Sequence, residues 1–316
     1  RRDEIRAQPK KPPRTRLKEV SETISTGHCL HKGSLKMRYK YPIISAIVAL
    51  TAFLYNPTPG FAIILGTAEN FAVLGSSTVT NTGSSVVTGD LGVNPGSAIV
   101  GFPPGIVNGT IYGPGGVSLQ AWTDATAAWT SLQNMPFTSD LTGLDLGTFL
   151  TPLTSGVYHF DSSAQLTGAL TLDAQGLDNA FWVFQIGSTL TTASSSSVAL
   201  INPGSNNGVF WQIGSSATLG TSTSFLGNIL ADQSVTLTTG ADIVCGRAFA
   251  LNGAVTMDTN DISAICGEGS EGTSRGFSGG LEFDENGGVA PVPEPATMAL
   301  LGSGLLGFAG LRKKRS

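Results

Sequence analysis

A short threonine repeat is the feature of this sequence that most restricts its fold. "TLTT" occurs at residues 189–192 and 236–239, "TLGT" at 218–221 and "TMDT" at 256–259. In each copy polar residues alternate with an apolar one, which predicts a short strand with a buried centre. The copies that start at 218, 236 and 256 lie 18 and 20 residues apart. A period of this length indicates the stacked coils of a β-solenoid.

A second motif alternates with the threonine repeat and pairs two short strands around a Gly or Asn corner. Its copies are "VVTGDLGV" (86–93), "IVNGTIYG" (106–113), "FLGNILA" (225–231) and "IVCGRAFA" (243–250). One threonine strand followed by the two halves of this motif predicts three strands per coil. The third strand, as in "FWVFQIG" (181–187) and "VFWQIG" (209–214), is apolar on both faces and therefore needs an outer cover.

The cover is predicted to be a single helix at about residues 117–134, lying lengthwise along the third side. Its apolar face is formed at helical spacing by Trp122, Ala125, Trp129 and Leu132, with Ala121 and Ala128 beside them. Pro136 ends the run. We interpret Trp182 and Trp211 on the third side as core and helix-packing residues rather than as a platform for carbohydrate.

The side that carries the threonine repeat is left without an apolar cover. Coils stack about 4.8 Å apart and alternate residues of a strand lie about 6.6 Å apart, so outward side chains form a flat grid. The sequence predicts one column of Thr78, Thr171, Thr189, Thr218, Thr236 and Thr256. A second column reads Thr80, Asp173, Thr191, Gly220, Thr238 and Asp258, so two carboxylates and a glycine interrupt it.

Several longer motifs together resemble the microbial ice-binding-like domain, over about residues 66–263. They include "NFAVLGSSTVTNTGSSVVTGDLGVNPGSAIVGFPPG", "GVYHFDSSAQLTGALTLDAQG" and "RAFALNGAVTMDTN". The resemblance implies an all-β solenoid, namely a discontinuous right-handed β-helix of triangular cross-section with one long α-helix packed along its axis. It also implies adsorption to the surface of an ice crystal through a flat face, with freezing-point depression and inhibition of recrystallisation. Members of this family also serve as cell-surface or matrix proteins of biofilms without strong ice activity, which is the alternative function.

Threonine suits an ice-binding surface because its methyl group prefers to leave water, its hydroxyl hydrogen-bonds, and its branched side chain is stiff. The alternative is that the ladder only stabilises the scaffold, since cross-strand Thr–Thr pairs contribute about 0.2–1 kcal/mol. With the resemblance, we assign ice contact to the nine threonines of the two columns. The adjacent side, with Ser85, Ala199, Ser224 and Asp242, is the other candidate face.

The N-terminal residues are typical of an export signal. From Met37, a short basic region, an apolar run over 43–54 and small residues up to Ala62 predict a signal peptide at 37–62. A membrane anchor at 43–54 is disfavoured, because a spanning helix needs about 20 apolar residues. Residues 1–36 precede this signal, so we interpret them as a spurious upstream extension.

The C-terminal residues resemble the PEP-CTERM sorting signal of Gram-negative bacteria. Pro293, Glu294 and Pro295 precede an apolar stretch, 296–311, and a basic tail. The resemblance implies transient membrane anchoring through 296–311, processing of segment 292–316 by an exosortase, and delivery to the outer cell surface or extracellular matrix. A plain tail anchor is the alternative. Between the solenoid domain, 63–266, and this segment, the Gly/Ser-rich residues 267–291 predict a flexible linker.

Charge argues against several other functions. Residues 63–266 carry twelve Asp/Glu and one basic residue, Arg247, so a nucleic-acid partner is excluded. A polysaccharide lyase needs basic residues, and only Arg247 and His159 are present. Carboxylate pairs drawn from Asp161, Asp173 and Asp178 lie in turn-like sequence. We therefore predict no enzyme activity, cofactor or metal, and keep extracellular polysaccharide as a further partner for the alternative function.

Cys245 and Cys266 are the two cysteines of the predicted exported chain, and they lie 21 residues apart, about one coil. Stacked Cα atoms about 4.8 Å apart fall within the range that a disulfide accepts. The spacing predicts a bridge that clamps the last coil, and two inert buried thiols are the alternative.

Overall fold

The computed structural model describes residues 62–266, 275–284 and 288–292, all within one compact unit of the chain. The upstream extension, the signal peptide up to residue 61 and the sorting triplet at 293–295 lie outside the described residues, as does the apolar stretch at 296–311. Among the described residues, no helix combines the length and apolar character that crossing a bilayer needs.

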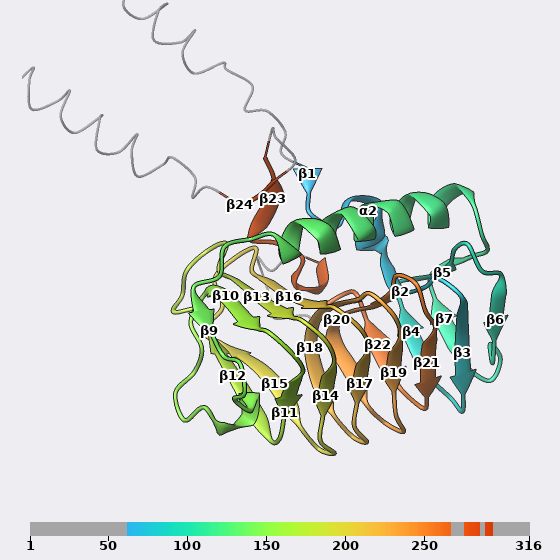
Figure 1. Cartoon of the computed structure of the whole chain (residues 1–316). Helices are drawn as coiled ribbons and strands as arrows, with labels where there is room; N and C mark the ends of the chain where they lie inside the picture. Colours follow the sequence, from blue (N-terminus) through green and yellow to red (C-terminus); the bar gives the residue numbers. More distant parts are fainter. Residues whose placement is uncertain (1–61, 267–274, 285–287, 293–316) are drawn as a thin grey trace, which may run out of the picture. The chain divides into compact units, whose positions relative to one another are not determined.

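The first side of the solenoid is a seven-stranded parallel sheet (Figure 1). In spatial order it contains β11 (Ala164–Leu166), β14 (Leu190–Thr192), β17 (Ala217–Leu219), β19 (Val235–Leu237), β21 (Val255–Asp258), β3 (Thr78–Thr82) and β6 (Ala98–Val100). All neighbours pair in parallel, as successive turns of a coil must.

The second and third sides belong to a 14-stranded sheet that turns the corner between them. The second side holds β12 (Ala169–Asp173), β15 (Ser197–Ile201), β22 (Asp261–Ser263), β4 (Val86–Thr88) and β7 (Ile106–Asn108). The third side holds β9 (Ser139–Asp140), β10 (Gly156–Phe160), β13 (Phe181–Ile186), β16 (Gly208–Ile213), β2 (Phe71–Gly75), β5 (Asp90–Val93) and β8 (Ile111–Tyr112).

Two long strands, β18 (Ser224–Ala231) and β20 (Asp242–Ala250), run through the corner and serve both sides. They bend at Gly227 and Gly246, both at positive φ. A Cβ on Gly246 would lie 1.9 Å from the carbonyl oxygen of Gly227, so only glycine allows the coils to stack here. The predicted pairing of two strands around a corner is confirmed.

The coils are not stacked in the order of the chain. β2, near the start, lies between β20 and β5, with Val73 opposite Ala248 and Leu91. In the same way β3 pairs with β21, and β4 with β22. The solenoid is therefore discontinuous, as expected, because its earliest coils are added onto its last one.

The helix α2 (Gly116–Gln133) lies along the third side, one residue from the predicted bounds at each end (Figure 1). Its small buried residues Ala121, Ala125 and Ala128 allow a close approach to the sheet. Its two tryptophans are half-buried, and their indole N–H groups donate to the carbonyls of Leu251 and Ile213 at 2.7 and 3.1 Å. Helix packing thus closes the apolar outer face of this side.

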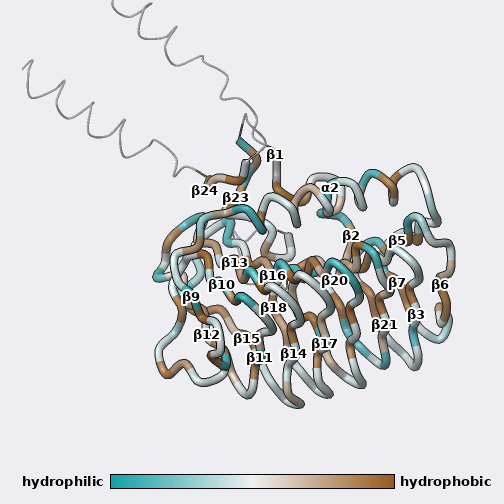
Figure 2. The backbone as a smooth tube through the Cα atoms, viewed as in Figure 1, coloured by the Kyte–Doolittle hydropathy of each residue, from teal (hydrophilic) through white to brown (hydrophobic). Residues whose placement is uncertain are grey.

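Trp182 and Trp211 are fully buried inside the solenoid, which confirms their core role. Trp211 stacks on Phe184 with ring centroids 4.0 Å apart and contacts Phe225 at 4.9 Å. The helix is contacted instead by adjacent residues of the same strands, such as Val183 and Phe210, whose side chains point to the opposite face. Figure 2 shows hydrophobic and hydrophilic residues in short alternating segments along the coils.

The flexible linker predicted for 267–291 is wrong for the described part of that segment. Residues 275–284, here named the C-terminal strap, comprise a 3-10 turn, η3 (Arg275–Phe277), and strand β23 (Leu281–Phe283). β23 pairs antiparallel with β1 (Ala62–Ile63) and with β24 (Val289–Pro291). Phe277 and Leu281 are buried, 6% and 2% exposed, so two apolar side chains hold a Gly-rich segment in place.

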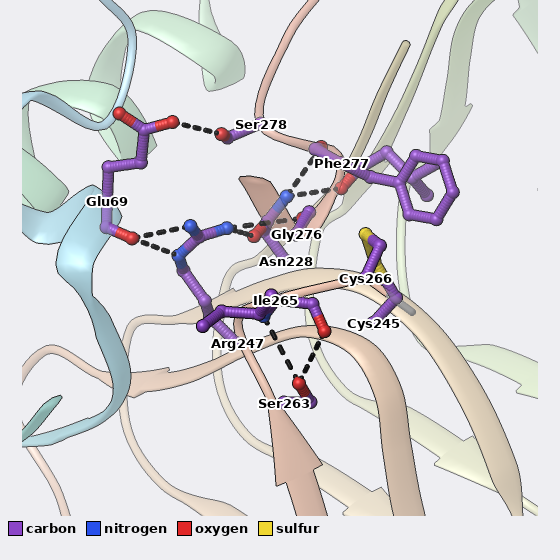
Figure 3. The surroundings of a disulfide bond; sticks show 11 residues. Glu69, Asn228, Cys245, Arg247, Ser263, Ile265, Cys266, Gly276, Phe277 and Ser278 are labelled. Atoms are coloured by element: carbon purple, nitrogen blue, oxygen red, sulfur yellow. Dashed lines mark hydrogen bonds between the residues drawn. A yellow bond between two sulfur atoms is a disulfide. The ribbon is translucent and has the colours of Figure 1, made fainter. Parts of the chain in front are cut away.

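Arg247 ties this strap to the solenoid (Figure 3). Its side chain is fully buried, and the guanidinium donates to the carbonyls of Glu69 and Gly276 and to Oδ1 of Asn228. Asn228 Nδ2 in turn donates to the carbonyl of Phe277 at 2.8 Å. The one basic residue of the solenoid is thus a structural centre that joins three segments distant in sequence.

Cys245 and Cys266 form a disulfide, with Cα atoms 5.0 Å apart, which confirms the prediction (Figure 3). Replacing both with alanine is expected to lower the free energy of unfolding by about 3 kcal/mol, because the unfolded chain loses a 21-residue closed loop. Urea unfolding of the oxidised parent and of the double variant measures this. The parent under reducing conditions is the control, and equal midpoints for oxidised parent and variant would contradict the prediction.

Candidate functional site

The outward surface of the seven-stranded sheet, here named the threonine face, carries a row of threonines in register. Thr191 is opposite Thr218, Thr218 opposite Thr236, Thr236 opposite Thr256, and Thr256 opposite Thr80. These five form the central row, which Gln165 and Val100 extend at its two ends. Neighbouring strands of a sheet are about 4.8 Å apart, so the row is a regular ladder.

The ladder is held flat by the residues behind it. Each central threonine follows an inward residue of the same strand, and these are fully buried: Leu190, Ala217, Val235, Val255 and Val79. Because they pack into one core cluster, the strands are fixed and the outward side chains have little freedom to shift. Branching at Cβ restricts the threonine rotamers further.

The hydroxyls of the central row have no hydrogen-bond partner in the part of the chain that the structure describes. Within the described part of the chain, none of these five side chains hydrogen-bonds another protein group, unlike several threonines beside them. Thr189 Oγ1 donates to Ser163 at 2.8 Å, and Thr238 Oγ1 donates to the carbonyl of Leu219 at 2.8 Å. The central row therefore presents aligned methyl and hydroxyl groups that are free to meet an external lattice.

The nine predicted threonines are not all placed as expected. Thr80, Thr191, Thr218, Thr236 and Thr256 are brought together in one row. Thr78 and Thr189 precede the row by two residues and flank it, so Thr78 is opposite Ala98. Thr238 flanks it on the other edge, next to Asp258, which is opposite Thr82.

Thr171 does not lie on the threonine face, and its placement there is wrong. It belongs to β12 on the second side, where it is opposite Ala199. Gln165 of β11 takes the place in the row that the sequence prediction gave to Thr171. Sequence reasoning missed Gln165 because "AQL" lacks the paired threonines of the repeat.

The second side, the other candidate face, is interrupted by charge. Ser197 is opposite Ser224, and Ser224 opposite Asp242, whose Oδ1 accepts from the backbone N–H of Asp261 at 2.7 Å. Burial raises the pKa of the Asp242 carboxyl, and the Asp261 charge adds to this. Ser85, predicted to lie on this face, is instead fully buried and accepts from the N–H of Asn260 at 2.9 Å.

The residues considered for catalysis make local contacts. His159 Nε2 lies 3.0 Å from Asp161 Oδ1, and its ring stacks on Phe137. Asp173 accepts from the N–H of Gln175, and Asp178 from that of Ser205. Among the residues that the structure describes, no three His, Cys, Asp or Glu side chains are grouped to hold a metal ion.

Comparison with protein families gives a match over residues 73–263 to the model described as ice-binding-like. The chain belongs to the ice-binding-like family. The match contains all strands of the threonine face, β3, β6, β11, β14, β17, β19 and β21. The family description is one of binding, not of catalysis.

Individual relatives, compared by sequence and by structure, support this family assignment. The chain is 53% identical over 282 residues to the ice-binding protein of Nostoc sp. strain HG1, covering 89% of this chain and 98% of that protein. The crystal structure of the ice-binding protein of the Antarctic ascomycete Antarctomyces psychrotrophicus is similar with a TM-score of 0.60 at 39% identity. That match covers 64% of this chain and 97% of the fungal one. An ice-binding protein 1 domain of Shewanella frigidimarina matches with a TM-score of 0.58 at 30% identity, covering 64% and 96%.

A second family model, the PEP-CTERM protein-sorting motif, matches residues 291–315. This ice-binding-like chain thus carries a bacterial signal for export and surface association, with processing by an exosortase. The motif begins at Pro291, the last residue of β24, so the described part of the chain ends where the sorting segment starts.

Proposed function

We propose that this protein binds ice through the threonine face and thereby inhibits ice growth and recrystallisation. The observation that carries the proposal is the central row of five threonines in register, whose hydroxyls have no hydrogen-bond partner among the described residues. The names of its relatives support ice as the ligand.

The physical basis is a match between two ordered surfaces. Ladder rungs about 4.8 Å apart are comparable to repeats of the ice lattice, so water held by the hydroxyls and around the methyls can join the crystal. The row arrives pre-ordered, because its strands are fixed by the core and the side chains lose little rotamer entropy on binding. Protein molecules adsorbed on the crystal then restrain the growth of the ice surface between them.

The central row is narrow, and its width limits the ice-binding activity that we expect. Its flanks include Asp258, half-buried on one edge, and Ala98 on the other. A carboxylate holds its own hydration water strongly and interrupts the apolar character of the grid. We therefore expect moderate ice activity, from the central row with Thr78, Thr189 and Thr238 at its margins.

The sorting motif supports a location for this activity. We place the processed protein on the outer surface or in the extracellular matrix of a Gram-negative-type bacterium, after export through the predicted signal peptide at 37–62. There it would limit ice growth next to the cell.

A matrix role without strong ice activity is the second candidate, in which the many surface carboxylates of the solenoid would contact matrix polymers through cations. Twelve carboxylates and one buried arginine make residues 63–266 markedly acidic. Binding of an anionic extracellular polysaccharide would then require bridging cations and would respond to salt, whereas adsorption to ice through uncharged threonines would not.

The test is to place tyrosine in the middle of the row. Thr218→Tyr with Thr236→Tyr is expected to lower thermal hysteresis and recrystallisation inhibition about tenfold, since a loss of about 1.4 kcal/mol of adsorption free energy is enough. Both positions point outward on strands, where tyrosine is well accepted. The activities are measured on residues 62–292, which keep the strap.

The matched control is Ser197→Tyr with Ser224→Tyr, an equally adjacent pair on the second side. Loss in the control pair alone would move the ice-binding site to that side. A folded parent without ice activity at high concentration would overturn the proposed function and leave the matrix role.

A further inference from the structure

The two ends of the solenoid are built differently. At one end, segment 139–153 folds over the coil that contains β11 and β12, through bridges from Asp145 to Gln165 and from Leu153 to Leu172. Leu141 and Leu146 of this segment are 7% and 0% exposed, so the core is sealed there. A sealed end is what a stacked-coil protein requires to remain soluble.

The other end, here named the open end, is the coil made by β6, β7 and β8. Each of these strands pairs on one side only, with β3, β4 and β5 respectively. Ile111 continues the inward row of Val73 and Leu91, both fully buried, yet is itself 47% exposed. The apolar interior therefore reaches the surface here, beside three strand edges that no described residue pairs with.

Outward side chains at the open end are apolar as well. Val100 is 55% exposed at the end of the central row, and Ile106 is 56% exposed at the end of the second side. Exposed strand edges with apolar side chains are the sites at which chains associate, unless charge prevents it.

Charge is sparse at this end, where the Asp90 carboxylate of the neighbouring coil accepts from the backbone N–H of Thr110 at 2.8 Å. No Asp, Glu, Lys, Arg or His occurs from Leu91 to Thr123, a segment that contains β6, β7 and β8. Elsewhere the solenoid is acidic, so two copies repel each other at those other surfaces. At the open end itself, a basic partner would gain little electrostatic attraction. An equally apolar surface with strand edges available for pairing is the complement, and a second copy provides one.

We propose that two copies of this chain associate through their open ends. A two-fold axis perpendicular to the stacking direction sets each edge strand antiparallel to a strand of the partner, which satisfies free backbone groups on both chains. The apolar patch formed by Val100, Ile106 and Ile111 is then covered by the same patch of the second copy. This association does not depend on what the threonine face binds.

Sedimentation velocity over a range of concentrations tests the proposal on residues 62–292, which contain the whole described unit. The parent is expected to form dimers in a concentration-dependent way, and more strongly at high salt, because the acidic surfaces are then screened. Val100→Asp with Ile106→Asp is expected to weaken dimerisation at least about tenfold, as two like charges would meet across the axis. Leu144→Asp with Leu150→Asp, 49% and 100% exposed at the sealed end, is the matched control and should leave the dimer intact.

A cross-linking variant covers the case in which the aspartates disturb the fold. Ala98→Cys in exposed β6 introduces the one free thiol of this segment, because Cys245 and Cys266 are bridged. A short bismaleimide is expected to link two Ala98→Cys chains and not two Leu150→Cys chains. A parent that stays monomeric at every concentration, dimers that survive the aspartates in a folded variant, or equal cross-linking at both ends would each overturn the proposal.

Discussion

Replacing Arg247 with methionine is expected to lower the free energy of unfolding by about 3–5 kcal/mol, although the side chains are similar in volume. The guanidinium is fully buried and is the donor for the Glu69 and Gly276 carbonyls and for Asn228 Oδ1. Without it, the buried Gly276 carbonyl and Asn228 Oδ1 lose this donor at a cost of about 1–3 kcal/mol each, and the part-buried Glu69 carbonyl costs less. Denaturant unfolding followed by circular dichroism measures the change.

A local readout separates this role from a general packing loss. Because Arg247 holds the carbonyl of Gly276, the methionine variant should be cut faster by proteases within the C-terminal strap than within the coils. Arg247→Lys keeps the charge but not the fork of donors, so it should fall between parent and methionine variant. An unfolding midpoint equal to that of the parent would contradict the assignment of Arg247 as a structural centre.

Replacing Trp211 with alanine is expected to cost about 3–5 kcal/mol, through lost burial and the cavity left behind. Trp211 is fully buried, stacks on Phe184, and donates its indole N–H to the carbonyl of Leu226 at 3.0 Å. The cavity would lie between adjacent coils, where rigid strands limit collapse. Thermal unfolding monitored by near-ultraviolet circular dichroism measures both stability and the loss of the aromatic stack.

Trp211→Phe is the matched control for this prediction. It keeps a ring opposite Phe184 and Phe225 but removes the hydrogen bond to Leu226, so it should cost clearly less than alanine. Equal stability of the alanine variant and the parent would show that the interior is not closely packed at this position.

The parts of the fold that sequence predicted well are those with a local signal. The helix has a one-sided apolar pattern, and Pro136 stops it, so its bounds were predicted within one residue. The corners carry glycines that close packing demands, and the cysteine spacing equals one coil. In each case a few adjacent residues contain the information.

The register of the threonine face could not be predicted in the same way. Outward positions repeat every two residues, so Thr78 and Thr80 fit an alternating pattern equally well and only long-range pairing selects Thr80 for the central row. The interval from Thr171 to Thr189 matched one coil by coincidence. Extra residues in the turns of "LDAQGLDN" instead make Gln165 the neighbour of Thr191.

The C-terminal strap shows how composition misleads. Its glycines suggested a flexible linker, but Gly276 and Gly280 adopt positive φ and shape the turns that bring Phe277 and Leu281 into the core. Two buried apolar residues and one bonded arginine are enough to order a segment whose average composition is that of a linker.

The discontinuous order of the coils affects how the chain is made. A chain exported from its N-terminus delivers β2 and β3 first, yet one partner of each, β20 and β21, lies near the end of the solenoid. β5 and β6 pair with one edge of this early segment, but its other edge stays unpaired on the far side of the membrane until the strands near the end of the solenoid have crossed. Such dependence on distant pairing predicts slow, all-or-none maturation and makes chaperone protection of the emerging chain advantageous.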